Sequence, residues 1–217
     1  ASGMMAVHEH DILHLDLKTE NVLLTDDGMP WVADFGLSTS LTSMSASAAQ
    51  RGTTRYKSPE RMRTRKQGGA VASKAADVYG FAVLAWEVLT GVQAWKGLTD
   101  IQIMMNVHFK SKRPELPDGR RWEDEVAERT GCPELVSLIK TAWAQDHERR
   151  PDFQTIGTSS LTSSSPRPLR RRRSRSGPRT CKCAWLWKRP RGGSCEKRPR
   201  QKQHLLTPGG KQSKEVP

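Results

Sequence analysis

The segment from Lys74 to Thr90 constrains the fold more than any other, because apolar residues occupy nearly every face of it. Ser73 precedes it and Gly91 follows it, and these residue types cap the beginning and the end of helices. A helix that is apolar all round lies inside a protein core or a membrane. Its longest apolar stretch, Phe81 to Leu89, is too short to span a bilayer. The sequence therefore predicts a helical core built around this segment.

Two acidic residues interrupt this helix. An acid inside a buried helix needs a partner, so we expect Asp77 to have one. Glu87 stands beside Trp86, and we interpret it as a charge on the helix surface or at an interface. We expect His8, His10 and His108 to pack against other residues or to face solvent, rather than to bind a ligand.

Three further segments predict helices. Met4 to Ile12 has the pattern of a helix that ends and enters a loop, and Asp100 to His108 predicts a shorter helix. Another begins at Pro133, a residue favoured at the first helical position, and continues to Trp143. After Ile156 the apolar pattern gives way to Ser, Pro and Arg. Together these elements predict a mainly α fold that ends near residue 158.

The sequence also predicts one β-hairpin. Its strands are the apolar runs Asn21–Leu24 and Pro30–Ala33, and Thr25–Gly28 between them contains Asp-Gly, a strong turn signal. Residues 37–50 are mostly Ser, Thr and Ala without an apolar period, so we interpret them as a mobile loop.

The formal net charge of +13 is concentrated towards the C-terminal end. Residues 151–217 contain 17 Lys and Arg against 3 Asp and Glu, whereas residues 1–150 contain 19 against 20. We therefore predict a near-neutral globular segment followed by a disordered, basic, low-complexity tail at residues 159–217. The run Arg170–Ser176 could contact nucleic acid or direct nuclear import. Alternatively, the tail has no specific partner, or it is sequence translated past an exon boundary.

The cysteines indicate the redox setting. Three of the four lie in the tail, and none belongs to a paired framework. Such usage is typical of a reducing, intracellular protein, so the predicted localisation is cytoplasmic, or nuclear through the basic tail.

Four polar residues flank the predicted hairpin. Asp16, Lys18 and Asn21 lead into its first strand. Asp34 follows its second strand, so the hairpin brings all four to the ends of adjacent strands. Phosphoryl transfer needs a carboxylate to orient the attacking hydroxyl, oxygen ligands for Mg²⁺ and a cation on the moving phosphate. Asp16 fits the first role and Lys18 the third, while Asn21 and Asp34 supply the oxygen ligands that Mg²⁺ prefers.

With these residues the chain resembles the protein kinases. His14–Asn21 matches the catalytic-loop pattern H-R-D-L-x-x-x-N, and Asp34–Gly36 matches D-F-G. Gly52–Glu60 is similar to the segment that ends in A-P-E. Asp77–Phe81 looks like the start of the family's central buried helix, and Arg149–Pro151 resembles its late Arg-Pro motif. Five motifs in the family's order make chance similarity negligible.

The resemblance implies a function for each matching residue. Asp16 would orient the substrate hydroxyl, and Lys18 would contact the phosphate in transfer. Asn21 and Asp34 would hold the Mg²⁺ that accompanies ATP. Thr53 would support Asp16 and Lys18 from the substrate-binding loop. The segment that carries these residues, 1–158, would be the C-terminal lobe of the kinase domain.

Other matching residues would support the site. Glu60 would pair with Arg150, and Asp77 would bind the backbone of the catalytic loop, residues 14–21. Leu23 would form the floor under the adenine. His14 and Phe35 would stack on each other in a hydrophobic column, and Gly36 would complete the D-F-G turn.

The resemblance also suggests a type. Lys18, two residues after Asp16, is the choice of serine/threonine kinases, and Trp86–Gly91 looks most like the tyrosine-kinase-like group, which includes the receptor-interacting kinases. ATP-dependent phosphorylation of protein Ser or Thr is the function this implies. The alternative is a non-catalytic, kinase-like interaction module with a basic nucleic-acid-binding or targeting tail.

The sequence departs from the family pattern at two places. Leu15 stands where the family has an Arg that pairs with a phosphate on the activation segment, residues 34–60. We therefore predict that phosphorylation of the Ser/Thr-rich stretch, residues 38–47, is not the main switch that activates the kinase. Only 13 residues precede His14, and they contain neither a glycine-rich phosphate loop nor a strand Lys. We expect this chain alone to be nearly inactive and marginally stable.

Overall fold

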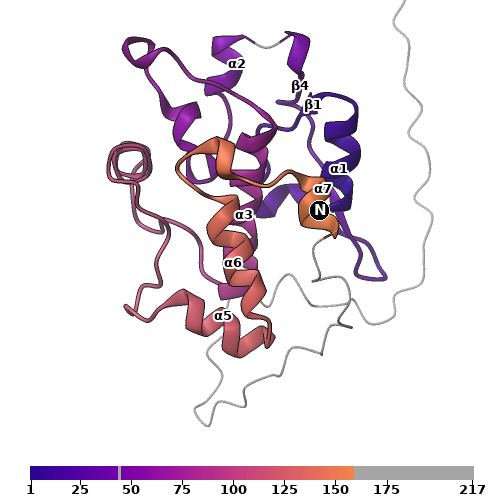
Figure 1. Cartoon of the computed structure of the whole chain (residues 1–217), viewed down its shortest axis with the longest axis vertical. Helices are drawn as coiled ribbons and strands as arrows, with labels where there is room; N and C mark the ends of the chain where they lie inside the picture. The colour runs from indigo at the N-terminus through magenta and orange to yellow at the C-terminus, as the bar shows by residue number, and fades with distance from the viewer. Residues whose placement is uncertain (44, 159–217) are drawn as a thin grey trace, which may run out of the picture. The chain divides into compact units, whose positions relative to one another are not determined.

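The computed structural model describes residues 1–43 and 45–158. The predicted mainly α fold is confirmed (Figure 1). The α-helices are α1 (Ser2–Glu9), α2 (Ala46–Gln50), α3 (Lys74–Thr90), α4 (Asp100–Met104), α5 (Trp122–Thr130), α6 (Pro133–Ala142) and α7 (Phe153–Thr158). The strands are β1 (Ile12–Leu13), β2 (Val22–Leu24), β3 (Pro30–Val32) and β4 (Thr39–Ser40). The predicted tail and its nucleic-acid contact lie outside the described residues.

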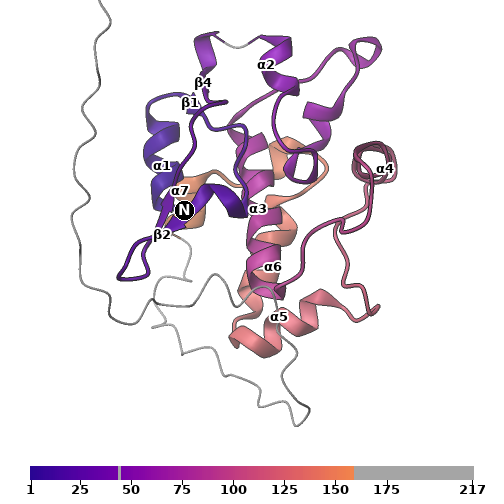
Figure 2. The same ribbon diagram turned by 180° about the vertical axis from the view of Figure 1, so that it is seen from behind.

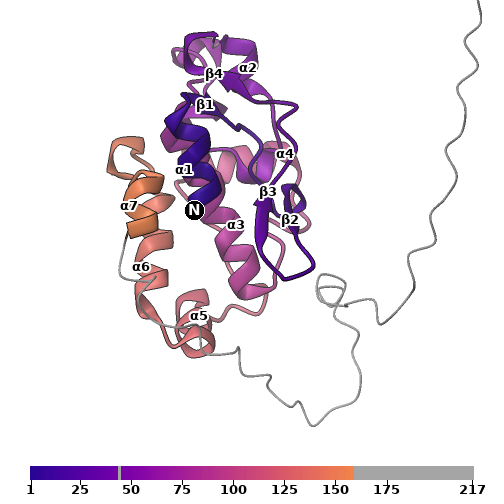
Figure 3. The same ribbon diagram turned by 90° about the vertical axis from the view of Figure 1, so that its right-hand side faces the viewer.

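Helix α3 is the centre of the core, as its sequence predicts. The Ser73 side chain accepts a hydrogen bond from the Ala76 N–H at its beginning, and Gly91 ends it with a φ of 72°. Figure 3 shows α3 between α6 and the β2–β3 hairpin. Its buried side chains pack with residues from α1, α4, α5, α6 and α7. The largest of them, Tyr79 and Trp86, have no exposed surface.

Helices α1 and α7 lie side by side, although they come from opposite ends of the described chain (Figures 1 and 2). The ring of His8 on α1 meets the ring of Phe153 on α7 edge to face, with centroids 5.0 Å apart. Phe153 also contacts Phe81 of α3. The beginning of the chain is thereby fixed to the core.

The predicted hairpin is present. In β2 and β3, Val22 pairs with Val32, Leu23 with Trp31 and Leu24 with Pro30. Gly28 adopts a φ of 85° in the turn, a conformation that suits glycine. Because neighbouring residues of a strand point to opposite faces, Leu23 and Trp31 share one face of the hairpin and Val32 packs on the core from the other.

The interpretation of residues 37–50 as a loop is wrong for much of that stretch. Thr39–Ser40 form β4, which pairs with β1, and residues 46–50 form α2. The Ser45 side chain caps α2 by accepting from the Ala48 N–H. Ala48 and Ala49 are buried. Small residues conceal this contact in the sequence, because two buried alanines produce no apolar period.

Two other helices differ from the prediction. Helix α4 gives way at Met105 to a π-helical turn, Met105–Phe109. Helix α5 was not predicted, because it is mostly polar and buries only Trp122 and Val126. Among the described residues, no helix is long and apolar enough to cross a membrane.

Candidate active site

Asp77 holds the catalytic loop by its backbone. One carboxylate oxygen accepts the His14 N–H at 2.8 Å and the other accepts the Leu15 N–H at 2.9 Å. The His8 ring nitrogen lies 3.0 Å from the same carboxylate. Asp77 is only 2% exposed, so these three contacts are the partners that a buried acid requires. They fix the loop against α3 and allow Leu15 its φ of 65°.

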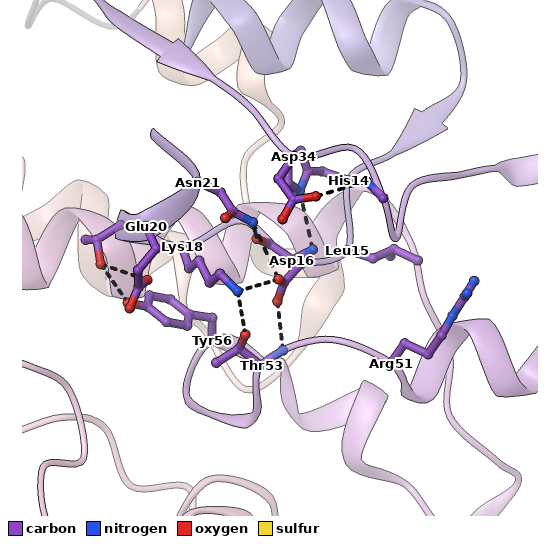
Figure 4. A network of polar contacts seen from close by, with 12 residues as sticks. His14, Leu15, Asp16, Lys18, Glu20, Asn21, Asp34, Arg51, Thr53 and Tyr56 are labelled. Atoms are coloured by element: carbon purple, nitrogen blue, oxygen red, sulfur yellow. Dashed lines mark hydrogen bonds and ion pairs between the residues drawn. The ribbon is translucent and has the colours of Figure 1, made fainter. Parts of the chain in front are cut away.

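Asp16, Lys18 and Thr53 form a closed triangle of hydrogen bonds (Figure 4). The Lys18 ammonium donates to one Asp16 carboxylate oxygen at 2.7 Å and to the Thr53 hydroxyl at 3.2 Å. The Thr53 N–H donates to the other carboxylate oxygen at 2.7 Å. Burial raises the pKa of Asp16, but the hydrogen bonds from Lys18 and Thr53 outweigh it and hold that pKa below its ordinary value. Asp16 is therefore a carboxylate at neutral pH.

Asn21 and Asp34 lie beside this triangle (Figure 4). The Asn21 side-chain amide donates to the Asp16 carbonyl at 2.9 Å, and its own oxygen accepts no hydrogen bond from a described residue. Asp34 is exposed, has a φ of 61° and accepts the Gly36 N–H at 3.2 Å. An amide oxygen and a carboxylate fit Mg²⁺, which takes one or two protein oxygens together with substrate phosphates. In the described part of the chain no three His, Cys, Asp or Glu side chains gather as a metal site.

An exposed apolar surface adjoins these polar groups. Leu23 is 58% exposed and its cross-strand partner Trp31 is 66% exposed. Phe35 of the D-F-G turn is also exposed, and its ring packs 5.0 Å from the His14 ring. The structure therefore places predicted Leu23 on an open face rather than inside a pocket.

The Glu60–Arg150 pair predicted from the resemblance is present and deeply buried. Two parallel hydrogen bonds of 2.7 and 2.9 Å join the guanidinium to the carboxylate. Arg150 also donates to the Ala75 and Ala144 carbonyls, and it lies over the Tyr79 ring. The pair thereby ties the end of the activation segment to α3 and to the chain after α6.

The interpretation of Glu87 as a charge on the helix surface or at an interface is wrong, because the side chain is buried. It is 8% exposed and accepts hydrogen bonds from the Tyr56 hydroxyl at 2.5 Å, the Thr19 hydroxyl at 3.1 Å and the Ala94 N–H at 2.7 Å. Burial and the bond to Glu87 raise the pKa of Tyr56. The network joins the catalytic loop, the activation segment and α3. Tyr56 and Thr19 lie 31 and 68 residues from Glu87 in sequence, so spacing gave no signal of these two side-chain contacts.

Gly52 lies where the activation segment passes close to the catalytic loop. Its φ is 93°, and an added Cβ would lie 2.6 Å from the Leu15 carbonyl oxygen. We expect Gly52→Ala to lower the free energy of unfolding by about 2–4 kcal/mol, from left-handed strain plus the steric clash.

Gly68→Ala is the matched control for Gly52→Ala. Gly68 has a φ of 89°, and nothing lies within 4 Å of its added Cβ. The Gly68→Ala variant has the same backbone strain without the steric clash, so its free energy of unfolding should fall by about 1 kcal/mol. Urea unfolding of both variants tests this difference, and equal losses would show that the close approach at Gly52 is unimportant.

Comparison with known proteins identifies the family. The family model described as "protein kinase domain" matches residues 1–161. The serine/threonine/tyrosine-protein kinase HT1 of Arabidopsis thaliana is 33% identical over 71% of this chain and 35% of its own length. The serine/threonine-protein kinase CTR1 of the same plant is 34% identical over 72% of this chain and 17% of its own length. The chain belongs to the protein kinase family.

The relatives also bear on the type. Mitogen-activated protein kinase kinase kinase 13-B of Xenopus laevis is 32% identical over 72% of this chain and 15% of its own length. Together with HT1 and CTR1 it supports the prediction of a serine/threonine kinase of the tyrosine-kinase-like group. The chain spans about a third or less of the length of these relatives.

Proposed function

We propose that residues 1–158 form the C-terminal lobe of an ATP-dependent serine/threonine protein kinase. The observation that carries the proposal is the triangle of Asp16, Lys18 and Thr53 beside Asn21 and Asp34. One carboxylate, one cation and two oxygen ligands are the groups that phosphoryl transfer requires of a protein.

Each group has a distinct task in this proposal. Asp16, kept ionised by Lys18 and Thr53, accepts a hydrogen bond from the substrate hydroxyl and orients its oxygen towards the γ-phosphate. Lys18 places positive charge where the transferring phosphate oxygens gather charge. Asn21 and Asp34 would hold Mg²⁺, which neutralises phosphate charge when bound. Thr53 keeps the first two side chains in position from the activation segment.

The exposed hairpin face fits the nucleotide side of such a site. Leu23 and Trp31 offer apolar surface next to Asn21, and the adenine would lie on this face. A contiguous exposed apolar patch is typical of a ligand or partner surface. Covering it requires the second lobe of a kinase, whose glycine-rich loop and strand Lys position the phosphates.

We expect the 217-residue chain alone to transfer no phosphate above background, because positioning supplies most of the catalysis of phosphoryl transfer. Fused in frame behind the nucleotide-binding lobe of a serine/threonine kinase, it should transfer phosphate to Ser or Thr of a protein. The measurement is incorporation of labelled γ-phosphate from ATP with Mg²⁺, and again with EDTA.

The two arms separate the outcomes. Mg²⁺-dependent transfer by the chain alone would contradict the proposed need for a second lobe. A folded fusion that binds ATP but transfers nothing would contradict the kinase function, and would favour the interaction module. Transfer confined to tyrosine would contradict the proposed substrate class.

A further inference from the structure

Arg61 is a buried cation whose hydrogen bonds all go to main-chain carbonyls. It is 4% exposed and follows Glu60 at the end of the activation segment. Its guanidinium donates to the carbonyls of Ala49 at 3.1 Å, Leu15 at 2.8 Å and Arg51 at 2.6 Å. Among the described residues it forms no ion pair. Sequence reasoning assigned this residue no role.

The three carbonyls belong to segments that are distant in sequence. Leu15 lies in the catalytic loop, whereas Ala49 and Arg51 lie at the end of α2, inside the activation segment. A planar guanidinium presents its donors in a rigid fork, so it fixes the distance between the groups it bridges. Arg61 thereby joins the two segments without a charged partner.

The bridged carbonyls stand next to the catalytic contact. Leu15 directly precedes Asp16, and Arg51 is two residues before Thr53. The Thr53 N–H donates to the Asp16 carboxylate at 2.7 Å, immediately beyond the bridge. Gly52 between them leaves no room for a side chain against the Leu15 carbonyl. The Arg61 bridge therefore lies within two residues of both partners of the Asp16–Thr53 contact.

Electrostatics allow this cation to remain buried. Burial lowers the pKa of Arg61, while the nearby carboxylates of Asp77, Glu60 and Asp16 raise it. None of the three carboxylates hydrogen-bonds to Arg61: Asp77 and Asp16 hold the loop contacts described above, and Glu60 holds Arg150. Burial is the larger effect and the pKa of Arg61 lies below its ordinary value, so the surrounding negative charge offsets part of the effect of burial while the Arg61 donors stay on the carbonyls.

We propose that Arg61 is a positioning residue that clamps the activation segment to the catalytic loop and keeps Thr53 on Asp16 without a phosphate group. Leu15 is buried and apolar, so it offers no cation to a phosphorylated segment. The Arg61 clamp takes the place of the phosphate switch, because its guanidinium donors carry their charge without phosphorylation. The catalytic consequence rests on the proposed kinase function, whereas the clamp itself can be measured without catalysis.

The first test is hydrogen exchange in the 217-residue chain with Arg61→Lys. Lysine keeps the charge but loses the fork, so we expect amides of residues 45–57 to exchange at least about tenfold faster, through local opening. The α3 amides should keep their wild-type rates. The control is Arg63→Lys, because Arg63 is exposed two residues further on. Unchanged exchange at residues 45–57, or equal acceleration throughout α3, would overturn the clamp.

The second test reads the Thr53 amide by NMR in the same variants. A hydrogen bond to a carboxylate is strong, so its loss in Arg61→Lys should move the Thr53 proton resonance upfield. In the fusion with a nucleotide-binding lobe, kcat should fall about tenfold while the KM for ATP stays unchanged. A Thr53 resonance at its wild-type position would overturn the proposal. An inactive wild-type fusion would instead contradict the proposed function and leave the amide result to decide on Arg61.

Discussion

Asp16→Asn should lower kcat by about three orders of magnitude when this chain is joined to a nucleotide-binding lobe. Asparagine has nearly the same shape and can still accept the Thr53 N–H through its amide oxygen. Its other terminal atom is an NH₂ donor, which would face the Lys18 ammonium where a carboxylate now accepts at 2.7 Å. The variant therefore loses both the acceptor for the substrate hydroxyl and the partner that positions Lys18. Steady-state phosphorylation of a Ser or Thr peptide measures the effect.

Asp118→Asn is the matched control for Asp16→Asn. Asp118 also pairs with a cation two residues later, Arg120, at 2.7 Å, but both side chains are exposed. Its replacement should leave kcat within about twofold, because exposed ion pairs contribute little. If Asp16→Asn retained a tenth of the wild-type kcat while ATP affinity and folding were intact, Asp16 would not be the group that orients the substrate hydroxyl.

The elements that could be predicted from the sequence are those whose signals are local. The cap residues Ser73 and Gly91 bound α3, and Asp27-Gly28 turns the hairpin, because each acts within a few residues of itself. The site residues around the hairpin were identified together since Asp16, Lys18 and Asn21 lie within six positions. Asp34 joins them through one tight turn.

The contacts that escaped prediction are made by residues far apart in sequence. The sequence indicates a charge on the helix surface or at an interface for Glu87, because no spacing rule connects it with Thr19 or Tyr56. Arg61 was overlooked because its partners are carbonyls, which every residue carries and no sequence pattern marks. The sequence indicates a loop at α2, because alanine can be buried without standing out from a run of small residues. In each case tertiary structure, rather than local propensity, decides the environment of the side chain.

The Leu15 departure gains a physical basis from these contacts. An activation segment held only by phosphate groups on its Ser and Thr hydroxyls would need a cation at residue 15 to bind them. Here the segment is held by Arg61, which directly follows it, and its end is held by the pair of Glu60 and Arg150. The prediction that phosphorylation of the Ser/Thr-rich stretch is not the main switch therefore agrees with a segment that these buried contacts already hold in place.

Arg150→Met should lower the free energy of unfolding by about 3–5 kcal/mol, because it leaves the buried Glu60 carboxylate without its cation. The variant also loses the donors to the Ala75 and Ala144 carbonyls. Lys74→Met is the control. It removes an exposed partner of Asp11 and should change stability little. Urea unfolding of the 217-residue chain measures both, and a loss for Arg150→Met no larger than that for Lys74→Met would contradict the structural importance of the pair.

The pH dependence of that loss identifies its cause. In the wild type, burial raises the pKa of Glu60 but the bonds from Arg150 outweigh it, so the folded-state pKa lies below the ordinary value. The stability from this pair is therefore complete above the ordinary pKa of Glu and is lost as pH falls through the lowered one. In Arg150→Met only burial remains, which raises the pKa of Glu60, so protonation should stabilise the variant. Acidification from pH 7 to about pH 5 should thus narrow the gap between the two proteins. A gap that is constant or widens over this range would show that lost packing, and not the unpaired carboxylate, accounts for the destabilisation.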